Sequence, residues 1–556
     1  MYAIADYLLD IVSALGAKEI FGVPGDYELN FLDHVTSRKD LKWVGNANEL
    51  NAAYMADGYA RKKGFATLIT TFGVGELSAL NGFAGSKAEN VPVLEIAGSP
   101  NTASQKNKAL VHHTLGDGNF IRFENAHRAL GFKVAHLTAD NAVNKINNLI
   151  KYILKTRKPA YLTIPTDVAE IKLNPKLKSE VISVVSHPEI ESDAKVIQKI
   201  TRELKEARRP MVMVGHEVSR FKLEKYVQKF ITDNNLPYTN NGFSKGVISE
   251  SLPQFIGTYN GDISSPKTKK IVDKADLILL LGTKLTDMTT GGFTQSFGND
   301  KTIDLNINRL KIFGQIYADP NFYNFPNTIK KLSNLKNLNL KNQPTNFHPV
   351  PEKVSGSNTK LTQEFYDKAL ISSLKPKETL ISENGTSFSG TEDKTLPQNV
   401  RFIAAPLWAS IGYTFPSALG SQIADPTSRS VLSIGEGSLQ MTIQEFSTAF
   451  RESLHPIILV IENHGYTVER FIHGMNQRYN DVPHLDYKKL PLAFGGNQNN
   501  YLALDASKEN ELLSALKKAQ SNKDKLVLID VKMDEKDAPW GLRKLAKKLA
   551  ENNEKK

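Results

Sequence analysis

Ile434-Gly-Glu-Gly-Ser-Leu-Gln440 and, further along, Ile457-Ile-Leu-Val-Ile-Glu-Asn-His-Gly465 are the two pieces of sequence that decide the fold of this chain. The runs Val431–Ile434 and Ile457–Ile461 are short and apolar, as is typical of buried strands in a parallel sheet. Residues 446–450 give the helix expected between them an apolar side. Because the loops after parallel strands emerge at the same edge of a sheet, where ligands bind, both polar loops are expected to face one site.

The first of these loops has the features of an anion-binding turn. Gly435 and Gly437 allow a tight turn in which backbone N–H groups approach an anion. Ser438 is expected to cap the helix that follows, and the N-terminus of a helix favours phosphate. A dinucleotide-binding loop is excluded, because Gln440 and not glycine closes the G-x-G-x-x-G frame.

The composition is that of an ordinary globular protein. The chain has 556 residues, enough for about three domains, and 40% of them are apolar and 23% charged. It contains no cysteine, which excludes disulfides, zinc–thiolate sites and thiol catalysis. No apolar run reaches the ~18–20 residues of a membrane span, and the first residues lack the basic segment of a signal peptide. No membrane contact and a cytoplasmic location are therefore expected.

The net charge of +11 makes nucleic-acid binding an alternative to weigh. The lysines are scattered along the sequence, without an arginine-rich patch interleaved with aromatic side chains. The favoured interpretation is a solvated basic surface that helps to attract small anionic molecules, so that no nucleic-acid partner is expected.

Buried strands alternate with helices along the chain, so an α/β fold is expected in which each domain is a parallel sheet flanked by helices. Three domains are predicted, at residues 1–175, 188–335 and 361–556. The stretches 174–187 and 335–359 are expected to be linkers. The middle domain lacks a complete nucleotide fingerprint and is expected to be a structural spacer.

Three polar features of the first domain are candidates for function. Asp26 follows the short predicted strand 20–23, at the carboxyl edge of the sheet. Glu49 lies near the start of a predicted helix, where its charge is favoured and where a helix cap is the alternative role. His112 and His113 lie in a polar loop, and two adjacent histidines in a loop are more often surface residues than catalytic ones.

The Gly-Glu-Gly loop and Asn463 resemble the thiamin-diphosphate motif, Gly-Asp-Gly followed at a set spacing by Asn-Asn. In enzymes with that motif, its acid, its second Asn and a backbone carbonyl two residues later hold Mg²⁺ on the diphosphate of the cofactor. The resemblance assigns these roles to Glu436, Asn463 and Gly465. The sequence departs from the motif at Glu436, at Glu462 in place of the first Asn, and at His464, where Asp is common.

Further motifs extend the resemblance to nearly the whole chain. They are Phe21-Gly-Val-Pro-Gly-Asp26, Asn46-Ala-Asn-Glu49, Thr71-Phe-Gly-Val-Gly-Glu76, Val111-His-His-Thr114, Pro406-Leu-Trp-Ala-Ser-Ile-Gly412 and Gly465-Tyr-Thr-Val-Glu469. Together they resemble the thiamin-diphosphate-dependent 2-oxo-acid decarboxylases, closest to the broad-range branched-chain enzymes. The resemblance implies a pyrimidine-binding N-terminal domain, a middle domain without cofactor contacts, and a diphosphate- and Mg²⁺-binding C-terminal domain. It also implies homodimers or homotetramers with shared active sites.

The same resemblance assigns roles to single residues. Glu49 matches the carboxyl group that binds the aminopyrimidine of the cofactor and activates it. The residues that match the proton-handling groups of the family are Asp26, His112, His113 and Glu469. Carboxylates and imidazoles in one cleft shift one another's pKa values and so provide proton donors and acceptors near neutral pH. The other predicted cofactor contacts are Thr71, Thr386, Ala409, Ile411, Gly437, Ser438, Asn463, Gly465 and Val468.

The matching positions also predict a substrate pocket lined by Met288, Phe388, Val468, Ile472, Leu545 and Leu549. Met288 is larger than its counterpart in the branched-chain enzymes and smaller than the aromatic residue of pyruvate decarboxylases. The predicted reaction is non-oxidative decarboxylation of a medium to large 2-oxo acid, such as 2-oxoisovalerate, phenylpyruvate or indolepyruvate, to the aldehyde and CO₂. The alternatives are pyruvate as substrate, a carboligase or synthase of the same superfamily, and a non-catalytic relative that has lost its metal site.

Overall fold

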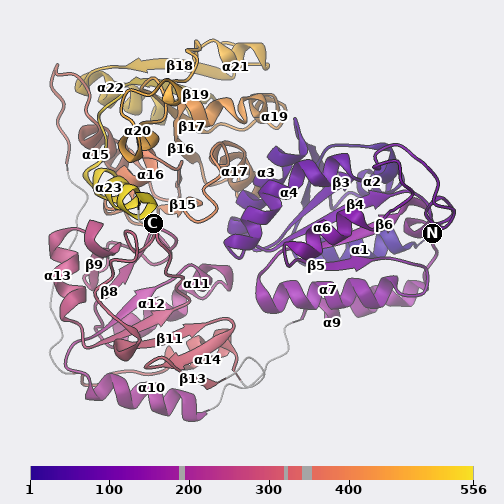
Figure 1. Ribbon diagram of the computed structural model, residues 1–556, viewed down its shortest axis with the longest axis horizontal. Helices are drawn as coiled ribbons and strands as arrows, with labels where there is room; N and C mark the ends of the chain where they lie inside the picture. Colours follow the sequence, from indigo (N-terminus) through magenta and orange to yellow (C-terminus); the bar gives the residue numbers. More distant parts are fainter. Residues whose placement is uncertain (1, 187–193, 319–322, 341–352, 555–556) are drawn as a thin grey trace. The chain divides into compact units, whose positions relative to one another are not determined.

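The computed structural model describes residues 2–186, 194–318, 323–340 and 353–554 (Figure 1). Its strands form three sheets, and the chain divides into two compact units. The first unit holds the N-terminal sheet together with Phe415–Thr427 and Thr442–Leu454, and the second unit holds the middle and C-terminal sheets. Among the described residues, no helix is both long enough and apolar enough to cross a membrane.

The N-terminal sheet has six parallel strands in the order β2-β1-β3-β4-β6-β5. The strands are β1 (Glu19–Gly22), β2 (Lys42–Gly45), β3 (Ala66–Thr71), β4 (Val93–Ser99), β5 (Lys133–His136) and β6 (Ala160–Pro165). The helices are α1 (Ile4–Ala14), η1 (Asp26–Glu28), α2 (Leu29–Thr36), α3 (Glu49–Lys63), α4 (Val74–Ala88), α5 (Thr102–Lys106), α6 (Arg122–Ala129), α7 (Ala142–Thr156) and α8 (Thr166–Ala169), drawn in indigo to violet in Figure 1. β3, β4 and β6 are buried along their whole length, which is why they are largely apolar.

The stretch after α8, expected to be a linker, is folded. It forms the 3₁₀ helix η2 (Pro175–Glu180) and the helix α9 (Val181–Val185). α9 packs against α1 and α7, and its Val181 and Val184 are buried. The linker prediction is therefore wrong here, because two valines three residues apart give this short helix an apolar side. In the second predicted linker, residues 341–352 lie outside the described residues.

The middle sheet has seven strands in the order β13-β12-β11-β10-β7-β8-β9, of which β12 and β13 pair antiparallel at one edge. The strands are β7 (Pro210–Val214), β8 (Tyr238–Asn240), β9 (Phe255–Thr258), β10 (Leu277–Leu281), β11 (Thr302–Asn306), β12 (Arg309–Ile312) and β13 (Gln315–Ala318). The helices are α10 (Ala194–Glu206), α11 (Glu217–Arg220), α12 (Glu224–Asp233), η3 (Gly261–Ile263), α13 (Pro266–Lys274), η4 (Asn299–Lys301) and α14 (Phe325–Leu332).

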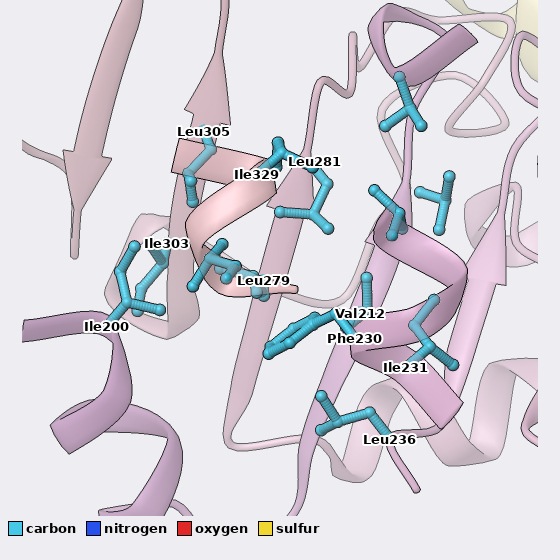
Figure 2. Packing of buried hydrophobic residues seen from close by; sticks show 14 of the residues in the cluster. Ile200, Val212, Phe230, Ile231, Leu236, Leu279, Leu281, Ile303, Leu305 and Ile329 are labelled. Atoms are coloured by element: carbon cyan, nitrogen blue, oxygen red, sulfur yellow. The ribbon is translucent and has the colours of Figure 1, made fainter. Parts of the chain in front are cut away.

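Both faces of the middle sheet are covered. Leu279 and Leu281 lie on one face, among the side chains of α10, α12 and α14, as Figure 2 shows. Ile278 and Leu280 belong to a second apolar cluster on the other face. Successive residues of a strand point to opposite faces, so a strand that is covered on both sides is apolar throughout, as Leu277–Leu281 is.

The C-terminal sheet has six parallel strands in the order β15-β14-β16-β17-β19-β18. The strands are β14 (Thr379–Ser382), β15 (Arg401–Ile403), β16 (Ser430–Gly435), β17 (Ile457–Glu462), β18 (Tyr501–Ala506) and β19 (Leu526–Lys532). The helices of this part of the chain are α15 (Gln363–Ser373), α16 (Thr386–Thr391), α17 (Thr414–Ala424), α18 (Glu436–Gln440), η5 (Ile443–Glu445), α19 (Phe446–Arg451), α20 (Thr467–Ile472), η6 (Arg478–Asn480), α21 (Leu490–Ala493), α22 (Glu509–Ser521) and α23 (Trp540–Glu554).

Both strands of the deciding stretch form as expected, as the parallel neighbours β16 and β17. The single helix expected between them is broken into α18, η5 and α19. α18 begins at Glu436 with Gly435 as its N-cap, and no side chain caps it. The prediction that Ser438 is the cap is therefore wrong, because the chain turns into the helix at Gly435, three residues earlier, and Ser438 lies inside the helix.

Candidate active site

Asp26, His112 and His113 lie together after the first strand of the N-terminal sheet. Asp26 begins η1, and the two histidines lie in the loop before α6. His112 Nε2 lies 2.6 Å from Asp26 Oδ2, and His113 Nε2 lies 3.6 Å from Asp26 Oδ1. The ring of Tyr27 stacks on His112 with 4.9 Å between centroids. The cluster can exchange protons among its members, and its ligand atoms, within 4.8 Å of one another, could also hold a metal ion.

The backbone of His113 has a left-handed conformation, with φ of 59°. This region is unfavourable for residues other than glycine, and such residues cluster at functional sites. Gly73 packs directly against it, because a Cβ on Gly73 would run into the carbonyl oxygen of His113. The N–H of Gly73 donates to Glu76 Oε1 at 2.8 Å. The turn after β3 therefore fixes the position of His113.

Glu49 is the first residue of α3 and is partly exposed. The capping side chain of this helix is Asn48, which accepts the N–H of Asn51, so Glu49 is not the N-cap. A Cβ on Gly75 would lie 3.4 Å from Glu49 Oε1 and 3.1 Å from Thr71 Cγ2. Glu49 and Thr71 thus lie beside the same glycine-rich turn that supports His113.

Glu436 is the acid of the deciding stretch, and its side chain folds toward the loop after β17. Its Oε1 accepts the N–H groups of Gly465 at 2.8 Å and Asn463 at 3.2 Å. Its Oε2 is buried without a hydrogen-bond partner among the described residues. Burial raises the pKa of Glu436 to about 7, although the two N–H groups favour the charged form. A buried carboxylate oxygen without a partner, on a glycine turn, fits a hard cation such as Mg²⁺.

Other predicted cofactor residues surround this acid. Gly437 and Ser438 are buried in α18, and a Cβ on Gly437 would lie 2.7 Å from the ring of Tyr466. The amide of Asn463 is oriented by its Nδ2, which donates to Thr467 Oγ1 at 2.9 Å.

Thr386, Ala409 and Ile411 lie on two connections of the C-terminal sheet. Thr386 begins α16 after β14, and the other two lie between β15 and α17. Ala409 is exposed and has a φ of 55°, the same left-handed conformation as His113. Ile411 is partly buried. An exposed backbone held in this conformation is suited to presenting a carbonyl group to a ligand.

The predicted pocket residues of the C-terminal domain come from three helices. Phe388 is on α16, Val468 and Ile472 are on α20, and Leu545 and Leu549 are on α23. α23 packs against both α20 and α16, so the five side chains belong to one group of packed helices. Phe388 and Leu545 are buried and the other three are partly buried.

Met288 lies in the loop after β10 and is partly exposed. Farther along this loop, Gly291 packs near Ile263 of η3, and η3 packs against α23. Glu469 is exposed on α20, next to Val468. The structure therefore connects the loop of Met288 to the helix group through η3.

Two buried glutamates near the predicted site were missed from the sequence. Glu28 is two residues after Asp26 and 1% exposed, and burial raises its pKa to about 8. Glu383 directly follows β14 and is completely buried. The signal that could have found them is the one used for Asp26, an acid close behind the end of a buried strand.

Three family models match the chain in order. They are "Thiamine pyrophosphate enzyme, N-terminal TPP binding domain" at residues 3–119, "Thiamine pyrophosphate enzyme, central domain" at 197–324, and "Thiamine pyrophosphate enzyme, C-terminal TPP binding domain" at 393–531. The matched residues include Asp26, Glu49 and both loops of the deciding stretch.

Curated relatives match over nearly the full length. An alpha-keto-acid decarboxylase of Mycolicibacterium paratuberculosis is 36% identical, over 97% of this chain and 95% of its own. An alpha-keto-acid decarboxylase of Mycobacterium tuberculosis is 35% identical, over 99% of this chain and 98% of its own.

A solved structure has the same fold. It is a Rhodococcus jostii thiamine diphosphate-dependent 4-hydroxybenzoylformate decarboxylase, with a TM-score of 0.77 and 20% identity, covering 96% of this chain and 99% of its own. The three sheets, the domain matches and the full-length relatives agree. The chain therefore belongs to the thiamine-pyrophosphate enzymes and, within them, to the 2-oxo-acid decarboxylase family.

Proposed function

We propose that the protein is an enzyme that decarboxylates a medium to large 2-oxo acid, branched or aromatic, to the aldehyde and CO₂ with thiamin diphosphate and Mg²⁺. The observation that carries the proposal is the buried, unpartnered Oε2 of Glu436, held beside Asn463 and Gly465 at the predicted metal position. A carboxylate in that setting requires a cation or a proton. The chain matches the TPP binding domain of the family, and the diphosphate of that cofactor is the group that such a cation would hold against Glu436.

Bound thiamin diphosphate supplies an electron sink for the electron pair that remains when CO₂ departs. Glu49 is assigned to hold a proton at the aminopyrimidine ring, beside the turn Gly73–Gly75. Asp26 and His112, 2.6 Å apart, and the nearby His113 are assigned to return a proton to the product carbon. Glu469 is assigned to the same proton transfer, because it is exposed on the helix that carries two pocket residues.

The cofactor residues divide by sheet in this proposal. Residues 1–175 bind the pyrimidine, residues 361–556 bind the diphosphate and Mg²⁺, and residues 188–335 make no cofactor contact. Thr386, Gly437 and Ser438 are assigned to the diphosphate. Ala409 and Ile411 are assigned to the bent middle of the cofactor, and the exposed left-handed backbone of Ala409 supports that role.

The size of the substrate is inferred from the pocket side chains. Val468 and Ile472 lie on α20, which packs against α23, and their partly buried aliphatic side chains suit an apolar side chain on the 2-oxo acid. Met288 leaves more room than an aromatic residue would. Phenylpyruvate, indolepyruvate and 2-oxoisovalerate are therefore preferred to pyruvate in this proposal.

The proposal includes a homo-oligomer, a dimer or a tetramer. Five large apolar side chains of the first unit, near its predicted site residues, are strongly exposed: Val74 (55%), Leu77 (43%), Leu110 (73%), Leu115 (68%) and Ile121 (54%). Exposed apolar groups of this kind are typical of surfaces that a partner covers. Sedimentation velocity tests the oligomer, and cell fractionation tests the cytoplasmic location predicted from the sequence.

Aldehyde release from a panel of 2-oxo acids, with Mg²⁺ and thiamin diphosphate present, tests the reaction. The expected result is a higher kcat/KM for branched or aromatic acids than for pyruvate. A condensed hydroxy-keto product instead of the aldehyde would favour a carboligase. Absence of both cofactor binding and product would favour a non-catalytic relative.

A further inference from the structure

Glu383 is a completely buried carboxylate that joins two separate segments of the second unit. Its Oε2 accepts the N–H of Gly412 at 3.0 Å and the hydroxyl of Thr414 at 2.6 Å. Its Oε1 accepts the N–H of Asn384 at 2.8 Å and a longer bond of 3.4 Å from the Asn384 side chain. Both oxygens are thus occupied by donors, and the two oxygens face different segments.

The two segments are those assigned to different parts of the cofactor. One begins at Asn384 and leads through Gly385 into Thr386, the predicted diphosphate contact. The other contains Ala409 and Ile411, the predicted contacts of the bent middle, and ends at Gly412. The connection between β15 and α17 contains no regular secondary structure over residues 404–413, so an external hydrogen-bond acceptor stabilises its conformation.

We propose that Glu383 is a positioning residue that holds the diphosphate segment and the Ala409–Gly412 segment in one fixed arrangement, so that the diphosphate and the bent middle of the cofactor are received together. The inference rests on the proposed function, because that function assigns the two segments to the cofactor. The role given to Glu383 is a mechanical one: it touches neither substrate nor cofactor in this proposal.

An ionised carboxylate suits this role better than an amide. Burial raises the pKa of Glu383, while the bonds from Thr414, Asn384 and Gly412 favour its charged form. A glutamine has one acceptor oxygen and one NH₂ group. In either orientation the NH₂ would face a donor, either Asn384 N–H or Gly412 N–H, so one of the two segments would be released.

The matched control lies at the other end of the same strand. Glu378 directly precedes β14, as Glu383 directly follows it, and it is 5% exposed. It accepts the Lys375 N–H at 2.7 Å and a bond from Gln520 at 3.2 Å, neither of which belongs to a predicted cofactor segment. Glu378→Gln therefore reports the general cost of neutralising a buried glutamate here.

The experiment compares Glu383→Gln with Glu378→Gln in the full-length protein. Thiamin-diphosphate affinity at fixed Mg²⁺ should weaken about 10- to 100-fold in Glu383→Gln, the usual loss when a supporting residue is removed, and less than about twofold in the control. At saturating cofactor, kcat should also fall in Glu383→Gln. Equal affinities in the parent and Glu383→Gln would overturn the proposal.

A second readout needs no cofactor. Trp408 is 41% exposed within the segment that Glu383 holds, and the chain has only two other tryptophans, Trp43 and Trp540. In a Trp43→Phe, Trp540→Phe background, acrylamide should quench Trp408 more strongly in Glu383→Gln than in the parent or in Glu378→Gln. Equal quenching would overturn the proposal, whatever the protein binds.

Two outcomes separate the inference from the proposed function. If the parent protein binds no thiamin diphosphate, the function fails, and the Trp408 quenching still decides whether Glu383 holds its segment. If Glu383→Gln does not fold, Thr414→Val removes one donor at constant size. That variant should shift affinity and quenching in the same direction by a smaller factor, and an unchanged Thr414→Val would overturn the proposal.

Discussion

The N-terminal and C-terminal sheets have the same strand order but different polar groups at the ends of their strands. The first is β2-β1-β3-β4-β6-β5 and the second is β15-β14-β16-β17-β19-β18, so counting from β1 and from β14 gives one order for both. The first places imidazoles and carboxylates after its strands. The second places a glycine turn there, together with the buried acids Glu436 and Glu383. The same strand order thus supports two kinds of chemistry, and the loops that follow the strands decide which chemistry each sheet supports.

The connection that follows the second strand differs in length between the two sheets. In the N-terminal sheet it is residues 46–48, and in the C-terminal sheet it is residues 404–413. The short connection is held by its own side chains and by a buried glutamate outside it: Asn46 accepts an N–H from β1 at 3.3 Å, Asn48 caps the next helix, and Glu445 of η5 accepts the Ala47 N–H at 2.9 Å. The long connection is held from outside by Glu383. In both connections a buried glutamate from another segment of the chain therefore accepts a backbone N–H.

Two buried glutamates close to strand ends, one in each part of the chain, differ in their hydrogen bonds. Glu383 accepts hydrogen bonds on both oxygens, whereas neither oxygen of Glu28 has a hydrogen-bond partner of good geometry in the described residues. The nearby Thr71 hydroxyl and Gly25 N–H favour the charged form of Glu28, but burial outweighs them and raises its pKa to about 8. Glu28 is therefore mainly neutral at pH 7.

The largest effect is expected from the N-terminal sheet, at Glu49. Glu49→Gln should bind thiamin diphosphate as the parent does and lose about 10²–10⁴-fold in turnover, because an amide does not deliver the proton that the aminopyrimidine ring requires. Cofactor titration and single-turnover rates measure the two properties separately. Parental turnover in this variant would show that Glu49 takes no part in the mechanism. The proposed difference in chemistry between the two sheets would then be lost as well.

The pH dependence of stability should distinguish Glu28. A carboxyl with a pKa of about 8 in the folded chain and 4.5 in the unfolded chain keeps its proton in the fold after the unfolded chain has lost it. Stability is therefore lost as the pH rises from about 4.5 to about 8. Glu28→Gln should remove the Glu28 contribution to this slope, worth on the order of 3 kcal/mol between pH 5 and 8.

Urea unfolding at several pH values measures the Glu28 effect. The exposed Glu180 provides the control, and Glu180→Gln should keep the parental slope. A slope in Glu28→Gln equal to the parental slope would show that this buried carboxyl does not contribute to it.

A substitution in the C-terminal sheet should weaken cofactor binding instead of slowing turnover. Glu436→Ala should weaken the apparent affinity for thiamin diphosphate at fixed Mg²⁺ by about 100-fold, because it removes the charged oxygen assigned to the metal. Glu436→Asp, which restores the length found in the motif, should bind the cofactor more tightly than the parent. Glu378→Ala is the control for loss of a buried glutamate, and parental binding by Glu436→Ala would contradict the metal assignment.

The smallest effect is expected at the pocket. Met288→Ala should shift the ratio of kcat/KM values toward phenylpyruvate or indolepyruvate and away from pyruvate by about tenfold, since a few methylenes of pocket volume are worth about 1–3 kcal/mol. Met441→Ala is the control, because Met441 is 51% exposed. An unchanged ratio would place Met288 outside the pocket.

The strands and their order of appearance were predictable, because burial on both faces of a sheet leaves continuous apolar runs such as Leu277–Leu281 in the sequence. Candidate residues next to strand ends were predictable for the same reason. The break of one expected helix into α18, η5 and α19 was not, because apolar spacing over a few residues does not define a helix axis. The partners of Glu383 were not predictable either, since Gly412 and Thr414 are brought to it only by the folded sheet.

The hairpin β12–β13 exposes apolar side chains at one edge of the middle sheet. β13 is the terminal strand of its sheet, and Ile316 and Tyr317 on it are 69% and 43% exposed. A terminal strand offers unpaired N–H and C=O groups to any other chain, and exposed apolar side chains strengthen such pairing. The register shifts between Leu310 and Lys311, and an irregularity of this kind near a sheet edge hinders such pairing. Substitutions at residues 315–318 are therefore expected to affect the solubility of the protein at high concentration before any other property.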